Sequence, residues 1–116
     1  MINIAIIDQN EIFRTSLKTL LEQIEGFSVV MNTGYYGFPG RRCSAPIQVL
    51  LIDDGLGKEK CDKVLQEIHQ KNGQARSLTL VMFEDDLNAH ENQPDLILKS
   101  SCKKEFEERI KRLIKF

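Results

Sequence analysis

Short apolar runs that end in acidic residues constrain the fold of this chain more than any other feature of its sequence. Residues 2–7 and 48–52 are nearly continuous apolar runs, and acids follow both of them directly, at Asp8 and at Asp53-Asp54. A strand that is apolar along its whole length is buried on both faces, as the strands of parallel sheets are. Both runs therefore predict central strands of a sheet that helices cover on its two sides.

Segments with helical periodicity separate these runs from further strands. Apolar side chains recur at helical spacing after Asn10, which can cap a helix. The same spacing recurs over residues 59–71 and over residues 106–114. Strands are also predicted at residues 27–31, 78–83 and 95–98. Strands that alternate with helical crossovers predict an α/β fold with five parallel strands and helices on both faces.

Two of the expected crossovers depart from a regular helix. Residues 34–46 contain three glycines and two prolines, which predicts a loop or at most one turn. Residues 84–94 are mostly polar and begin with three acids, so we expect a solvated loop or helix N-terminus and a short helix around residues 87–90. The second and fourth crossovers are thus predicted to be irregular or shortened.

The composition fits one small globular domain over residues 1–116. A net charge of -1 supplies no basic field for nucleic acid, so we expect no nucleic-acid binding by this chain alone. Three cysteines, Cys43, Cys61 and Cys102, without a CxxC pair argue against a disulfide framework and a zinc site. Free thiols, no signal peptide and no membrane-length apolar run predict a cytoplasmic protein without membrane contact.

The acids after the two central strands point to a cation site. Ligands of open α/β sheets bind beyond the carboxyl ends of the strands, where the strand order reverses. If the order is 2-1-3-4-5, the reversal lies between the strands that end at Asp8 and Asp53. Carboxylates that converge there repel one another unless they share a cation, and hard oxygen ligands suit Mg²⁺. Acids also follow strands simply to start turns and cap helices, and that interpretation stays open.

Three segments resemble the receiver domains of response regulators in two-component signalling, in particular those of LuxR/NarL-type regulators. They are residues 4–17 (IAIIDQNEIFRTSL), 46–54 (PIQVLLIDD) and 96–100 (LILKS). The resemblance spans the chain with its segments in the right order. It implies a cytoplasmic signal-transduction domain, not a turnover enzyme. The implied fold is a flavodoxin-like three-layer sandwich whose five-stranded parallel sheet has the order 2-1-3-4-5.

The resemblance also implies a role for each residue near the acids. Asp53 takes the phosphoacceptor position and would attack a phosphohistidine on a histidine kinase or phosphotransfer protein. Asp8, Asp53 and the backbone carbonyl of Gly55 would hold Mg²⁺, which neutralises charge as the phosphoryl group moves. Lys99 would contact the phosphoryl oxygens.

Several positions differ from the receiver pattern. The second acid after the first strand is Gln9, an uncharged and weak metal ligand, so affinity for Mg²⁺ is expected to fall. The usual hydroxyl at the end of the fourth strand is replaced by Phe83, or by Met82 if the register is shifted by one, and the switching aromatic on the fifth strand by Leu96. We expect Phe83 to be a core aromatic that covers the pocket.

Three functions follow from these residues. The favoured one is an atypical receiver that signals through contacts with another signalling protein. The second is a fully functional Mg²⁺-dependent phosphoacceptor, supported by Asp8, Asp53 and Lys99. The third and weakest is a flavodoxin-like module that binds a small anion. The resemblance also allows a homodimer, although the surface that would form it is altered.

Overall fold

A single parallel sheet organises the computed structural model, which describes residues 1–38, 45–88 and 95–114. Its strand order is β2-β1-β3-β4-β5, and every neighbouring pair is parallel, which confirms the predicted order. The strands are β1 (Ile2–Ile7), β2 (Phe27–Thr33), β3 (Val49–Asp53), β4 (Arg76–Val81) and β5 (Leu96–Leu98). Cys43 and residues 89–94 lie outside the described residues.

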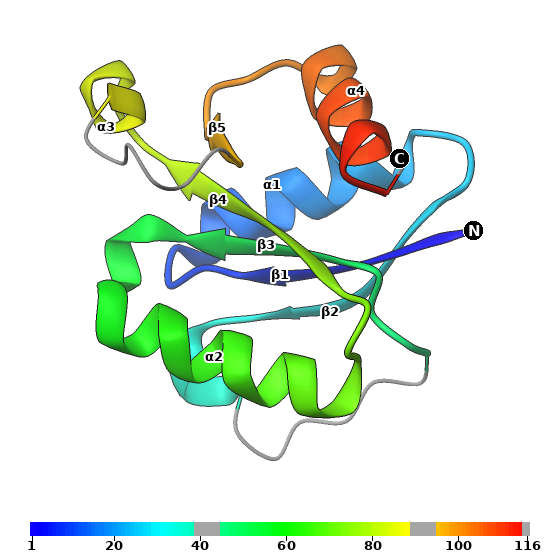
Figure 1. The fold of residues 1–116 in the computed structure, drawn as a ribbon. Coiled ribbons are helices and arrows are strands. Elements are labelled where there is room, and N and C mark those ends of the chain that lie inside the picture. The colour runs from blue at the N-terminus through cyan, green and yellow to red at the C-terminus, as the bar shows by residue number, and fades with distance from the viewer. Residues whose placement is uncertain (39–44, 89–94, 115–116) are drawn as a thin grey trace.

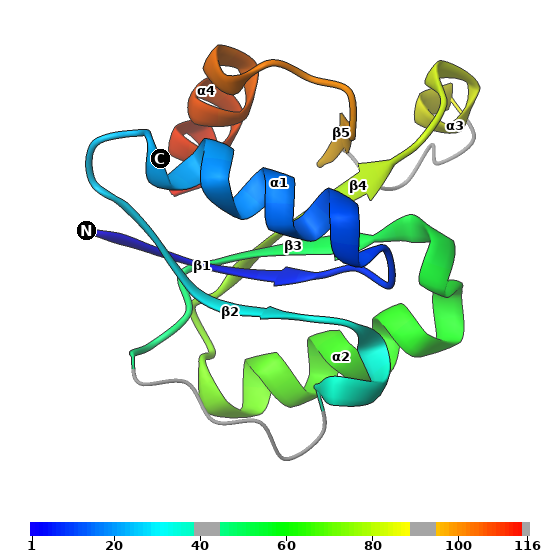
Figure 2. The same cartoon turned by 180° about the vertical axis from the view of Figure 1, so that it is seen from behind.

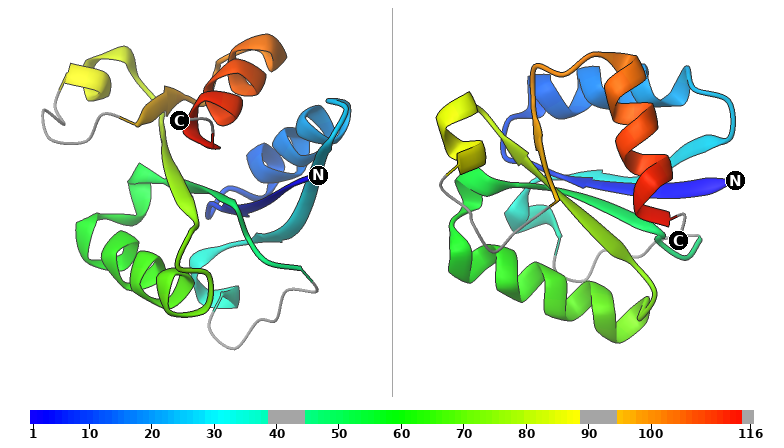
Figure 3. Two further views of the ribbon diagram at one scale, coloured as in Figure 1. Left: turned by 45° about the vertical axis from the view of Figure 1, so that its right-hand side comes forward. Right: turned by 45° about the horizontal axis from the view of Figure 1, so that its top comes forward.

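Three helices of twelve to fourteen residues cover the two faces of the sheet. They are α1 (Glu11–Glu22), α2 (Lys58–Lys71) and α4 (Lys103–Ile114). Helices α1 and α4 lie over one face, and α2 lies over the other (Figures 1 and 2). The predicted three-layer arrangement is therefore confirmed, and Figure 3 shows the layers from two further directions. No helix among the described residues is long and apolar enough to cross a membrane.

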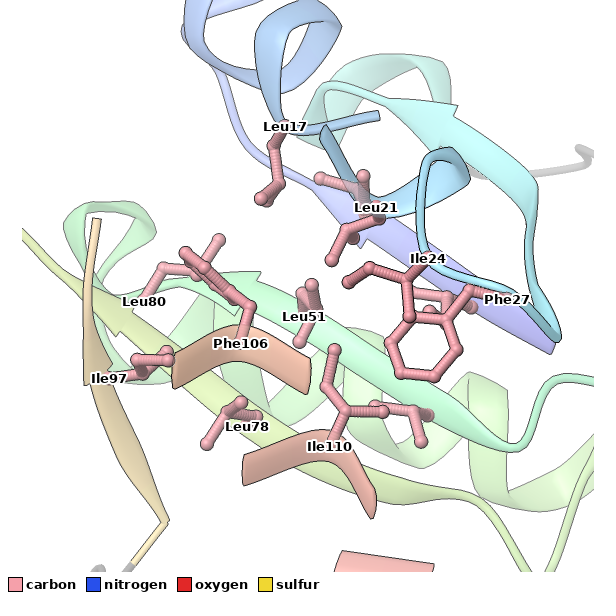
Figure 4. Packing of buried hydrophobic residues seen from close by; sticks show 13 residues of the cluster. Leu17, Leu21, Ile24, Phe27, Leu51, Leu78, Leu80, Ile97, Phe106 and Ile110 are labelled. Carbon is pink, nitrogen blue, oxygen red and sulfur yellow. The ribbon is translucent and has the colours of Figure 1, made fainter. Parts of the chain in front are cut away.

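Each central strand contributes side chains to two cores, which explains why residues 4–7 of β1 and 49–52 of β3 are all apolar. Ile4 and Ile6 of β1 pack beneath α1 and α4, whereas Ala5 and Ile7 pack against the α2 side. Figure 4 shows the first core, where Phe106 and Ile110 of α4 meet side chains of the sheet. Burial on both faces thus places β1 and β3 in the middle of the sheet.

The helix signals in the sequence correspond to actual helix ends. The Asn10 side chain accepts a hydrogen bond from Phe13 N at 3.0 Å and caps α1, as predicted. After β3, the short 3₁₀ helix η2 (Asp54–Leu56) is followed by Gly57, whose φ of 90° lies in the region that favours glycine. This turn redirects the chain from the end of β3 into α2.

The two irregular crossovers are confirmed for their described parts. The second contains only one 3₁₀ turn, η1 (Tyr35–Gly37), before residues that the structure does not describe. The fourth contains the five-residue helix α3 (Glu84–Asn88), which starts at the acids and earlier than predicted. Receiver-like helices at these two positions are therefore absent from the described residues.

The fourth strand ends sooner than predicted, and Phe83 is not a core residue. Val81 is the last residue of β4 and pairs with Leu98, the last residue of β5. Beyond that pair the chain turns into α3, so no sheet face remains to bury the next side chains. Met82 is 57% exposed and Phe83 is 65% exposed. The prediction that Phe83 is a core aromatic is therefore wrong.

Candidate functional site

Two carboxylates and one ammonium group meet at the carboxyl ends of the central strands. Lys99 Nζ lies 2.9 Å from Asp8 Oδ2 and 2.9 Å from Asp53 Oδ1. The side chains of Asp8, Asp53 and Lys99 are 0%, 11% and 13% exposed. We call these three residues the acid pocket. The structure thus brings together the three charged residues that the sequence singled out.

The sheet topology places these groups side by side. Ile7 of β1 pairs with Ile52 of β3, so the residues that follow them, Asp8 and Asp53, emerge at one edge of the sheet. Lys99 follows β5, and its backbone N donates to Val81 O of β4 at 2.8 Å. The long lysine side chain then reaches from there to both carboxylates.

Burial dominates the electrostatics of Asp8. Desolvation raises its pKa above the ordinary 3.8, although Asn10 N–H, which donates to Oδ1 at 2.8 Å, and the contact with Lys99 both oppose that rise. The Asp53 carboxylate raises the pKa of Asp8 further. Burial therefore disfavours the ionised form of Asp8, and the contacts with Asn10 and Lys99 partly offset that cost.

Lys99 is held as a cation. Burial lowers its pKa, but hydrogen bonds to Asp8 and Asp53 outweigh that effect and raise the pKa above 10.5. Nζ also lies 5.1 Å from the centre of the Phe13 ring, within range of a cation–π contact. Sequence reasoning missed Phe13 because its helical spacing indicated only a core position.

The predicted metal ligands differ in their availability. Asp8 Oδ2 is fully buried, and the Lys99 ammonium group 2.9 Å away compensates its charge. Gly55 N donates to Asp53 Oδ1 at 2.9 Å. The side-chain oxygen of Gln9 instead accepts a hydrogen bond from Tyr35 N. Within the described ranges, no group of three or more His, Cys, Asp or Glu side chains could hold a metal ion.

The resemblance to receivers predicts altered switching positions at Leu96 and at Phe83 or Met82. Leu96 is buried in β5, and its carbonyl accepts a hydrogen bond from Arg109 Nη2 at 2.6 Å. Met82 and Phe83 are both exposed beyond the end of β4, so the expected hydroxyl is replaced by an exposed apolar side chain whichever of the two residues takes that position. A hydroxyl and an aromatic ring that could respond together to a phosphoryl group are missing at these positions.

Cys61 of α2 also borders the site, which the sequence did not indicate. Its thiol Sγ donates to the Asp53 carbonyl at 3.5 Å, and burial raises its pKa to about 11. At pH 8 this leaves about a hundredfold less thiolate than a thiol at the ordinary value of 9.0.

We expect iodoacetamide to alkylate exposed Cys102 quickly and Cys61 about a hundredfold more slowly than an ordinary thiol, as measured by peptide-resolved mass spectrometry. Equal rates at Cys61 and Cys102 would contradict this.

Comparison with solved structures identifies the fold, whereas comparison of sequences finds no matching protein family and no matching curated protein. A response regulator from Thermotoga maritima superposes with a TM-score of 0.72 at 21% identity, covering 100% of this chain and 99% of that one. CheY6 from R. sphaeroides, solved with the P1 domain of CheA3, gives 0.71 at 15% identity over 97% and 96% of the chains. RcsB from Salmonella typhimurium gives 0.68 at 18% identity, over 97% of this chain and 60% of RcsB. With the topology and the acid pocket described above, these matches show that the chain has the fold of response-regulator receiver domains.

Proposed function

We propose that this chain is an atypical receiver domain of two-component signal transduction, with Asp53 at the phosphoacceptor position. The observation that carries the proposal is the placement of Lys99 Nζ at 2.9 Å from a carboxylate oxygen of both Asp8 and Asp53. The cation thus lies beside the group that would attack phosphorus and beside the buried acid that would support a metal. The domain acts as a switch and passes its state on through protein–protein contacts in the cytoplasm.

The chemistry at Asp53 is a transfer of a phosphoryl group. An Asp53 carboxylate oxygen attacks phosphorus, the N–P bond of a phosphohistidine breaks, and the released imidazole recovers its electron pair and takes up a proton. Lys99 neutralises charge on the transferred oxygens. When bound, Mg²⁺ would add charge neutralisation, and Asp8, Asp53 and the Gly55 carbonyl would hold it.

The departures in the pocket make this receiver atypical. Gln9 contributes no charge and its oxygen is already bonded to Tyr35 N, so the donor set for Mg²⁺ has two carboxylates. Lys99 already partly neutralises them. We therefore propose weak Mg²⁺ binding and slow phosphorylation. The pocket carries two carboxylates for one ammonium, which disfavours the alternative of a module that binds a free anion.

The fold supports a proposal for the class of partner. CheY6 was solved in complex with the P1 domain of CheA3 and has the same fold as this chain. We propose that a histidine kinase or phosphotransfer protein donates the phosphoryl group and that another signalling protein binds this domain to receive its output.

Labelling with a small phosphodonor tests the proposal. Incubation with Mg²⁺ and acetyl phosphate is expected to give a substoichiometric, phosphate-sized mass gain that Asp53→Asn abolishes. Stoichiometric labelling would instead identify a fully functional phosphoacceptor. Absence of labelling together with absence of Mg²⁺ binding at millimolar concentration would remove the phosphoacceptor role from Asp53.

Restoring the missing acid gives a second prediction. Gln9→Asp is expected to raise Mg²⁺ affinity about tenfold, equivalent to about 1.4 kcal/mol, and to increase labelling, because ligand charge tunes cation affinity. Mg²⁺ titration followed by calorimetry measures the change. Gln74→Asp adds the same charge just before β4, at the amino ends of the strands and away from the acid pocket. It should leave the affinity unchanged. An unchanged affinity in Gln9→Asp would show that Gln9 is not what weakens the site.

A further inference from the structure

Gln9 links the acid pocket to the turn that follows β2. It directly follows Asp8, and its Oε1 accepts a hydrogen bond from Tyr35 N at the start of η1. The approach depends on Gly34, because a Cβ at that position would lie 2.5 Å from Gln9 Oε1. The position where receivers carry a second acid therefore holds the η1 turn in this chain.

The η1 turn carries an aromatic group that contacts α2. The rings of Tyr35 and Tyr36 meet edge to face with their centres 5.2 Å apart. Lys60 Nζ lies 5.2 Å and 5.0 Å from the two ring centres and donates a hydrogen bond to Tyr36 Oη at 3.1 Å. We call these three residues the aromatic corner. Lys60 belongs to the first turn of α2, so the corner joins η1 to that helix.

The backbone around Asp8 ties Gln9 to the state of the pocket. Asp8 N donates to Thr33 O at 3.1 Å, and the Asp8 carbonyl accepts from Arg14 Nη1 at 3.0 Å. Asp8 Oδ1 accepts from Asn10 N on the other side of Gln9. These hydrogen bonds connect the Asp8 carboxylate and backbone to the loop that presents the Gln9 side chain.

We propose that Gln9 is a positioning residue that couples the acid pocket to the aromatic corner. The corner then reports the state of the pocket in place of the hydroxyl–aromatic pair that is missing near β4 and β5. This inference goes beyond the proposed function, because it concerns the coupling between two groups of residues and does not require phosphorylation of Asp53.

The composition supplies a selective probe of the aromatic corner. The chain contains two tyrosines and no tryptophan, and both tyrosines belong to the corner. The near-ultraviolet circular dichroism band of tyrosine, and tyrosine fluorescence, therefore report on this corner alone. Neither signal depends on a phosphodonor or a metal ion.

A double-mutant cycle tests the contact between Gln9 and η1. Gln9→Ala removes the acceptor, and Gly34→Ala displaces the Gln9 side chain by its added Cβ, so both are expected to cause the same loss of the tyrosine band. Gly34→Ala should cause no further loss in the Gln9→Ala background. Gly73→Ala is the matched control, since its Cβ would be 3.7 Å from the nearest atom, a backbone oxygen. Additive losses, or no loss in either single variant, would overturn the proposal.

Changes in the pocket test the coupling itself. Asp53→Asn, which keeps the shape of the side chain, and Lys99→Met are both expected to shift the tyrosine band in the natural sequence and not in the Gln9→Ala background. Far-ultraviolet circular dichroism verifies folding of each variant, and Asp53→Asn keeps the test decisive if Lys99→Met unfolds. A band unaffected by the folded variants, or shifted equally in both backgrounds, overturns the coupling. Failure of phosphodonor labelling would leave it standing.

Discussion

Lys99→Met is expected to lower the free energy of unfolding by about 3 kcal/mol at pH 7, as is typical when one partner of a buried ion pair is removed. The substitution leaves Asp8, which is fully buried, and Asp53, which is nearly so, as adjacent carboxylates without a cation. The methionine still fills most of the space of the lysine stem, so the loss is mainly electrostatic. Urea unfolding followed by circular dichroism measures it.

The pH dependence of this loss has a defined sign. Burial already raises the pKa of folded Asp8 above 3.8, so the folded state binds its proton more tightly than the unfolded state does. Protonated Asp8 favours the fold below pH 3.8, and that contribution disappears as the pH rises through the folded pKa. The deficit of Lys99→Met should therefore be largest at neutral pH and shrink as the pH falls towards 3.8.

Two further variants separate the electrostatic loss from other effects. Lys104→Met makes the same substitution at an exposed position of α4 and should change stability by less than about 0.5 kcal/mol. Adding Asp8→Asn to Lys99→Met removes one of the unpaired charges and should restore part of the stability. A deficit that persists unchanged at acidic pH and in this double variant would contradict the ion-pair explanation.

Phe106→Ala is expected to lower the free energy of unfolding by about 3–5 kcal/mol, the usual cost of truncating a buried phenylalanine. Phe106 is 1% exposed and is among the largest fully buried side chains. It projects from α4 towards Leu80 and Ile97 in the core between that helix and the sheet (Figure 4). Its removal leaves a cavity that the neighbouring strands close only in part.

Phe83→Ala is the matched control, because it makes the same substitution at a phenylalanine that is 65% exposed. Its expected cost is about 0.5 kcal/mol or less. A loss as large as that of Phe106→Ala would mean that Phe83 is a core residue after all. Chemical denaturation of the two variants side by side decides the matter.

The central strands could be predicted because burial on both faces leaves a signature at every residue. Ile4 to Ile7 alternate between two cores, and no polar residue is tolerated until the strand ends at Asp8. The same reasoning located Asp53. The placement of Lys99 near both acids was predicted from the resemblance to receivers and not from periodicity. A lysine after a short strand does not by itself indicate where its side chain lies.

The environments of Phe83 and Gln9 could not be read from local sequence. The apolar run continues through Met82 and Phe83, but β4 ends where its partner β5 ends, and that limit is set by pairing between distant segments. The side chain of Gln9 is placed by Gly34 and Tyr35, which lie beyond a helix and a strand. In both cases a tertiary contact, and not the residue type, decides the outcome.

The sheet joins two halves of the chain through the pairing of β1 with β3. The first half contributes β1, α1 and β2, and the second half contributes β3, β4 and β5. Ile4 to Ile7 of β1 pair with Val49 to Ile52 of β3 between them. Asp8 comes from the first half, and Asp53 and Lys99 come from the second. The acid pocket therefore forms only when the halves dock. We expect this docking to follow the rate-limiting step of folding, so Lys99→Met should mainly accelerate unfolding and leave the refolding rate nearly unchanged.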